Sequence, residues 1–113
     1  MVILVSSEFY MILTAFRSRA EADLFAENVV SRRLAACVNV FGPVVSTYWW
    51  LRKREKTEEF LALVKTSETR VEELVTELKR VHSYELPEVT VLKVSGSMEY
   101  VAWVMRETRR EAP

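Results

Sequence analysis

The pattern of apolar and polar positions predicts one strand, followed by one helix, in the first third of the chain. Tyr10 to Phe16 is rich in β-branched and aromatic residues and predicts a strand. A helix is predicted next, to about Arg33, because Ser18-Arg-Ala-Glu21 matches a capping box that satisfies backbone amides at a helix start. The apolar positions that then recur at helical spacing are Ala22, Phe25, Ala26 and Val29.

The middle of the chain predicts a long hairpin. Ala35 to Phe41 reads as a second strand, and Pro43, which has no N–H for a sheet, predicts a bulge or bend. Val44 to Trp50 resumes the extended pattern. The charged run 52–59 is expected to be a solvated turn, and Phe60 to Lys65 to be the third strand. Such a hairpin predicts an arm that projects beyond the sheet.

The last third predicts a helix, a strand and a final helix. Ser67 or Thr69 can cap the first of these helices, and Thr69 to Glu72 matches a capping box. Its apolar stripe consists of Val71, Leu74, Val75 and Leu78, continued by His82. Val89 to Val94 is predicted as the fourth strand, and Ser97 opens a last helix that runs to about Arg109.

The order β-α-β-β-α-β predicts an α+β fold of the ferredoxin-like, split βαβ type. We expect a single domain over residues 1–113, with two helices on one face of a four-stranded antiparallel sheet and a C-terminal helix. The strands carry apolar residues on both sides, and Tyr48-Trp49-Trp50 adds aromatic area. Because a single subunit covers only part of that surface, the sequence predicts an oligomer.

Charge and composition exclude several classes of function. Lys plus Arg and Asp plus Glu are 16 each, so no surplus positive charge favours nucleic acid. The apolar start, Met1 to Val5, is too short for a membrane span and lacks the features of a signal peptide, so a cytoplasmic protein is expected. Two isolated glycines allow neither a P-loop nor a dinucleotide fingerprint, and no organic cofactor is expected.

Chemistry-bearing residues are few. Cys37 is the only cysteine, so it forms no disulfide within the chain, and it is either a small strand hydrophobe or a metal-binding thiolate. His82 is the only histidine and opens a loop with Tyr84, Glu85 and Glu88, a combination that suits a ligand or an acid–base pair. A thiolate beside an imidazole would suit copper. No nucleophile or oxyanion-stabilising set accompanies His82 and Glu85, so an enzyme ranks last.

Five segments, in this order, resemble those of the CutA proteins, a family associated with divalent cation tolerance. They are Arg33-Leu-Ala-Ala-Cys-Val-Asn39, Tyr48-Trp-Trp50, Val64-Lys-Thr66, His82-Ser-Tyr-Glu-Leu-Pro-Glu88 and Tyr100-x-x-Trp103. The resemblance runs from about Tyr10 to Thr108. It implies a homotrimer similar in architecture to the PII signalling proteins, which binds copper or another divalent cation and catalyses no reaction.

The resemblance also assigns residues. Cys37 matches the family cysteine associated with metal, and we expect it to bind the ion together with His82 and Glu85, which match the family's loop motif. The cleft residues that it implies, between subunits, are Trp50, Lys65, Tyr84, Glu88 and Trp103. Two positions differ from the family pattern. Ser83 replaces a common proline, so a less rigid loop is expected, and Arg52 replaces a common glycine, which leaves the form of the hairpin turn open but not the fold. Residues before Tyr10 are expected to add a short strand or to be disordered.

Overall fold

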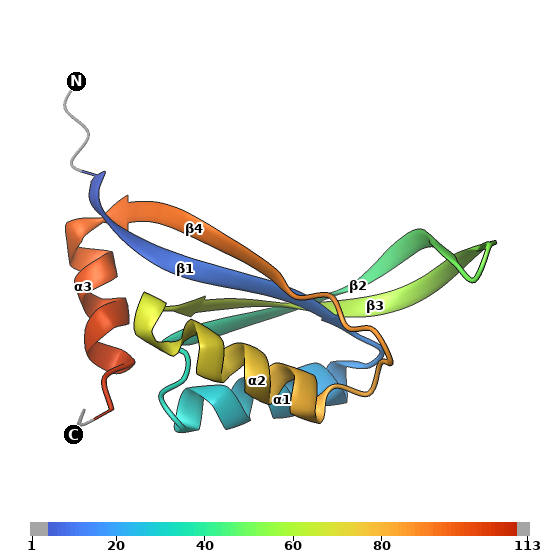
Figure 1. The fold of residues 1–113 in the computed structure, drawn as a ribbon, viewed down its shortest axis with the longest axis horizontal. Helices are drawn as coiled ribbons and strands as arrows, with labels where there is room; N and C mark the ends of the chain where they lie inside the picture. The colour runs from blue at the N-terminus through green and yellow to red at the C-terminus, as the bar shows by residue number, and fades with distance from the viewer. Residues whose placement is uncertain (1–4, 111–113) are drawn as a thin grey trace.

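A computed structural model describes residues 5–110 as one four-stranded sheet with three α-helices (Figure 1). The elements in chain order are β1 (Val5–Phe16), α1 (Arg19–Ser31), β2 (Cys37–Trp50), β3 (Lys53–Thr66), a 3₁₀ turn (Glu68–Arg70), α2 (Val71–Val81), β4 (Thr90–Ser97) and α3 (Met98–Glu107). The predicted α+β, ferredoxin-like fold is confirmed.

The sheet is antiparallel, with strand order β2-β3-β1-β4. The first strand therefore lies inside the sheet, where Ile12 is opposite Val64 of β3 on one side and Val91 of β4 on the other. The residues before Tyr10 extend β1 back to Val5. Residues 1–4, for which the sequence allowed a strand or disorder, lie outside the described residues.

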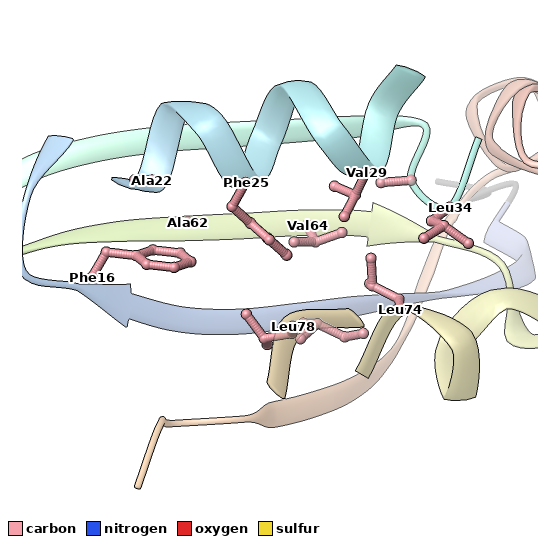
Figure 2. Close-up of a cluster of buried hydrophobic side chains, with 11 residues drawn as sticks. Phe16, Ala22, Phe25, Val29, Leu34, Ala62, Val64, Leu74 and Leu78 are labelled. Carbon is pink, nitrogen blue, oxygen red and sulfur yellow. The ribbon is translucent and has the colours of Figure 1, made fainter. Parts of the chain in front are cut away.

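Helices α1 and α2 cover one face of the sheet, as the apolar spacing predicts (Figure 1). Phe25 and Val29 of α1 meet Leu74 and Leu78 of α2 above the middle strands. Figure 2 shows these side chains converging on Val64 and its neighbours between the helices and the sheet. All of them are buried, so this layer is the main core and supplies most of the hydrophobic stabilisation.

The last helix packs on the opposite face, at one end of the sheet. Its Val101 and Val104 are buried against Phe9, whose side chain points away from the α1–α2 layer because residues alternate along a strand. Within residues 5–110, no helix covers the middle of that face. We call this part the open face, and its apolar side chains are Leu13, Leu61 and Leu63, half-buried, and Phe41 and Leu92, exposed. Met11, on the same side of the sheet, packs beside the α3 cluster.

The charged run 52–59 is not a turn, and this prediction was wrong. From Lys53 onward the run is the first half of β3, paired with β2 as far as Trp50 opposite Lys53. The two strands form an arm, residues 44–59, that extends past the rest of the sheet (Figure 1). Most side chains of the arm are exposed and face no core. Its strands can therefore pair through their backbones without a pattern of apolar residues.

Two irregularities shape this hairpin. The register shifts between Phe41 and Val44, so the bulge expected at Pro43 is confirmed. The connection at the tip consists of Leu51 and Arg52 alone, with φ values of 50° and 69°. Such left-handed pairs belong to tight hairpin turns and usually contain glycine. The turn forms although Arg52 has a side chain.

The predicted helix caps are only partly right. Ser18 accepts a hydrogen bond from the Glu21 amide at 3.1 Å, and Ser97 does the same for Tyr100 at 3.3 Å. The capping box at Thr69 is wrong, because residues 68–70 form a 3₁₀ turn and α2 begins only at Val71, without a side-chain cap. The Ser67 hydroxyl lies 2.8 Å from that of Thr108. None of the helices within residues 5–110 has the length and apolar character needed to cross a membrane.

Candidate functional site

A cleft of about 790 Å³ opens where the arm leaves the sheet. Its floor includes Ala15 of β1 and Glu59 of β3, which share the orientation of the open face. The arm forms one wall, and the loop between α2 and β4 forms the other. The side chains of these walls are Ser46, Tyr48, Trp50 and Thr57 from the arm, and Ser83, Tyr84, Glu85, Leu86 and Glu88 from the loop.

Tyr84 anchors the loop to the floor of the cleft. Its hydroxyl donates a hydrogen bond of 2.8 Å to Glu59, and the Arg17 guanidinium lies 5.7 Å from its ring centre. Burial and the bond to Glu59 raise the pKa of Tyr84 well above its usual range. The hydroxyl therefore stays protonated and remains a donor to the carboxylate.

His82 holds the start of this loop against the end of β1. Its ring stacks on Phe16 with centroids 4.4 Å apart, and Nε2 lies 2.8 Å from the carbonyl oxygen of Ala15. Nδ1 accepts a hydrogen bond of 3.1 Å from the Tyr84 amide, so Nε2 carries the proton and donates. Burial lowers the pKa of His82, which favours this neutral form. Both ring nitrogens are thus engaged with the backbone.

The remaining predicted loop residues lie at the rim. Glu85 and Glu88 are exposed cleft residues, and Glu88 accepts a hydrogen bond of 2.8 Å from the Thr90 hydroxyl. Trp50 lies toward the tip of the arm and is 37% exposed. The structure therefore brings Trp50, Tyr84, Glu85 and Glu88 together around one cleft.

The other predicted residues lie at the opposite end of the sheet. Cys37 is half-buried and stands opposite Lys65, whose ammonium donates to the side-chain oxygen of Asn39. Trp103 belongs to α3, with its ring 5.6 Å from that of Tyr100. Burial raises the pKa of Tyr100, and the nearby Cys37 adds to this shift. Cys37, Lys65 and Trp103 thus form a second group.

The two groups do not meet within one chain. Lys65 lies six positions along β3 from Glu59, which is roughly 20 Å at the usual rise of a strand. Across residues 5–110, no three His, Cys, Asp or Glu side chains gather closely enough to hold a metal ion. A single chain therefore does not assemble the set Cys37, His82 and Glu85.

Sequence reasoning missed several residues of the cleft, among them Glu59, Arg17 and Tyr48. Glu59 was assigned to a solvated turn, although it is only 9% exposed. Its position two residues before Leu61 on an alternating strand is the signal that places it on the open face. Arg17 and Tyr48 gave no signal for this site, because the cleft depends on how far the arm projects.

Residues 10–107 match the family described as CutA1 divalent ion tolerance protein. The chain belongs to this family. The Archaeoglobus fulgidus divalent-cation tolerance protein CutA is 36% identical over 88 residues, covering 77% of this chain and 85% of that protein. The human protein CutA is 40% identical over 88 residues, and the match covers 77% of this chain but only 49% of the human protein. Rice protein CutA 1, chloroplastic, is likewise matched over only 48% of its length.

Solved CutA structures have the same fold. CutA from Xylella fastidiosa superposes with a TM-score of 0.87 at 36% identity, covering 91% of this chain and all of that one. The divalent cation tolerance protein Cut A1 from Thermus thermophilus gives a TM-score of 0.85 at 33% identity, over the same shares of the two chains. The resemblance to CutA proteins noted in the sequence is thus confirmed for both family and fold.

Proposed function

We propose that this CutA chain forms a homotrimer that binds a divalent cation, copper above all, in clefts between subunits. The proposal is carried by one observation. The two groups of site residues lie on the same side of the sheet but too far apart to meet within one chain. A neighbouring subunit can place its Cys37 group against the His82–Glu88 loop, which one chain cannot do alone. Its trimeric state, expected to resemble that of PII proteins, is supported by the apolar open face.

The proposed ligands are Cys37, His82 and Glu85. A thiolate and an imidazole suit copper and other borderline-soft ions, and a carboxylate adds charge. Cys37 is the strongest candidate, because it is the only thiol of the chain and its side chain is half-buried rather than enclosed in the core. His82 can bind a metal only by giving up one of its two backbone hydrogen bonds. Trp50, Lys65, Tyr84, Glu88 and Trp103 would then line the shared cleft.

The test is a calorimetric titration of copper into the metal-free protein, in a buffer that does not chelate. We expect saturable binding, with one ion per subunit or one per trimer. Cys37→Ser combined with His82→Ala should abolish it, whereas Glu27→Gln, an exposed carboxylate on α1, should not. Affinity retained in the double variant would rule out this ligand set. No catalytic step and no organic cofactor are proposed, and a cytoplasmic location remains a prediction.

A second candidate is a PII-like regulatory or scaffold trimer whose partner is a protein or a small molecule. The arm favours it, because Val45 and Trp49 are 70% exposed and Leu51 is 80% exposed at its tip. Exposed apolar groups of this kind are typical of contact surfaces. If the copper titration gave only weak heat without saturation, copper would be binding nonspecifically at the protein surface. That result would favour this second candidate.

A further inference from the structure

The tip of the arm combines exposed apolar side chains with a cluster of cations. Leu51 is 80% exposed at the turn, and Trp49 is 70% exposed just behind it. Four cations, with a single carboxylate among them, occupy residues 52–56. Because the chain as a whole has no net charge, this cluster is a local concentration of positive charge.

The four cations of the tip are not neutralised by neighbouring carboxylates. Across residues 5–110, the ion pairs between side chains do not include Arg52, Lys53, Arg54 or Lys56. All four side chains are exposed. Exposed charges of one sign, gathered in one place, favour an anionic partner.

The tip also has a face that is turned away from the cleft. Trp49 is opposite Arg54 on the arm, and Thr47 is opposite Lys56. Tyr48, which lines the cleft, lies between Thr47 and Trp49 in β2. Since side chains alternate along a strand, the other four project from the outer face of the arm. This outer face is separate from the surfaces that would meet a second subunit or a metal ion.

The order of the groups at the tip matches the layers of an anionic lipid surface. Leu51 lies at the apex, where it can reach the hydrocarbon, and tryptophan rings favour the boundary between hydrocarbon and headgroups. Lys56 is three positions along β3 from Lys53, so the cations lie within roughly 10 Å, a span comparable to a headgroup layer.

The shape of the tip favours a bilayer over a protein or a nucleic acid. The arm is a two-stranded ribbon that projects beyond the rest of the sheet (Figure 1). A narrow projection of this kind offers no groove for a peptide or a nucleic acid strand to enter. It can enter a flat lipid surface, however, without a change of conformation.

We propose that the tip of the arm binds anionic lipid surfaces, with Leu51 and Trp49 inserted at the interface and the cations on lipid phosphates. An apolar anchor and a basic cluster act together in reversible membrane binding. The contact requires no metal, so it can fail separately from the copper proposal. It assigns the tip to lipid rather than to the protein partner of the second candidate function.

The experiment is co-sedimentation of the whole protein with vesicles in the presence of EDTA. We expect binding to vesicles of phosphatidylglycerol and phosphatidylcholine, none to phosphatidylcholine alone, and a loss of binding as the salt concentration rises. Lys56→Gln should weaken binding roughly fivefold, the usual contribution of one cation near an anionic surface. Lys79→Gln, which removes an exposed lysine from α2, is the matched control and should leave binding unchanged.

A second pair of variants tests the apolar anchor. Leu51→Ala should weaken binding roughly tenfold, whereas Leu24→Ala, the same change at a 72% exposed position of α1, should not. Tryptophan fluorescence gives a readout that does not depend on affinity. Its emission should shift to shorter wavelength on anionic vesicles, and the shift should be lost in Trp49→Phe and kept in Trp103→Phe.

Several results would overturn the proposal. These are no binding to anionic vesicles, equal binding to neutral vesicles, equal effects within either matched pair, and a fluorescence shift that survives in Trp49→Phe. Binding that falls in Lys56→Gln but is unchanged in Leu51→Ala would also overturn it, because it would indicate a contact by charge alone, as with an acidic protein.

Discussion

Glu77 of α2 is a buried carboxylate held by partners from two helices. It lies 2.7 Å from Arg80, 2.7 Å from Asn28 and 3.1 Å from Arg32. These hydrogen bonds, that of Arg80 first, lower the pKa of Glu77 from 4.5 to about 2. A carboxyl group whose pKa is lowered by folding stabilises the protein above its unfolded pKa and loses that effect as the pH falls.

We therefore expect Glu77→Gln to cost up to about 3 kcal/mol of unfolding free energy at pH 7. The difference from the parent protein should shrink as the pH falls from 4.5 and should vanish near pH 2. Urea unfolding at a series of pH values measures this. Glu72→Gln, an exposed position on the same helix, is the control. A difference that stayed constant down to pH 2 would show that ionisation of Glu77 is not the cause.

Residue types alone identified part of the site. Cys37 and His82 stood out because each is the only one of its kind, and the carboxylates near His82 stood out by proximity. Glu59 did not, because a glutamate in a charged run looks solvated. Its burial depends on strand register and on Tyr84, which is 25 residues further along the chain. Contacts over such separations are not visible in local spacing.

At the scale of elements, the tip of the arm is the weakest local fit between sequence and backbone. Arg52 has a φ of 69°, where a side chain costs energy and glycine does not. We expect Arg52→Gly to raise the free energy of unfolding by about 0.5–1 kcal/mol. Arg54→Gly, two residues into β3, should lower it instead, because glycine weakens a strand. Chemical denaturation of both variants measures these two differences. An Arg52→Gly variant less stable than the parent protein would contradict the interpretation that the Arg52 side chain strains the turn.

The helices, the core strands and the existence of a projecting arm followed from the sequence, and the first half of β3 did not. One side of each of these elements, α1, α2 and the central strands, is buried. The spacing of their apolar residues therefore predicts their secondary structure. Most residues in the first half of β3, which begins at Lys53, are exposed. This segment therefore lacks the alternation of apolar and polar residues that would predict a strand. Its conformation is set by pairing with β2, a contact that overrides the low strand preference of charged residues.

The whole molecule has a broad apolar surface on the open face, and the trimer proposal depends on it. Leu63 lies at its centre, opposite Leu13 on β1 and Asn39 on β2. We expect Leu63→Lys to weaken assembly, because a charge buried between subunits is costly. Sedimentation equilibrium should give three times 13.2 kDa for the parent protein and a shift toward 13.2 kDa for the variant.

The control for this variant is Thr76→Lys, which adds the same charge at an exposed position of α2. It should sediment as the parent protein does. A Leu63→Lys protein that kept the full mass would place the contact between subunits elsewhere on the molecule, for example along the arm.

The inner position of β1 has a consequence for synthesis on the ribosome. β1 is synthesised before both of its partners, β3 on one side and β4 on the other, and β4 is complete only at Ser97. Until then one edge of β1 has no partner, and unpaired edges are prone to pair with other chains. Nascent chains that are translated side by side on one messenger RNA are thus exposed to mispairing until β4 has been synthesised. Rapid closure of the β1–β4 pair after release should limit this hazard.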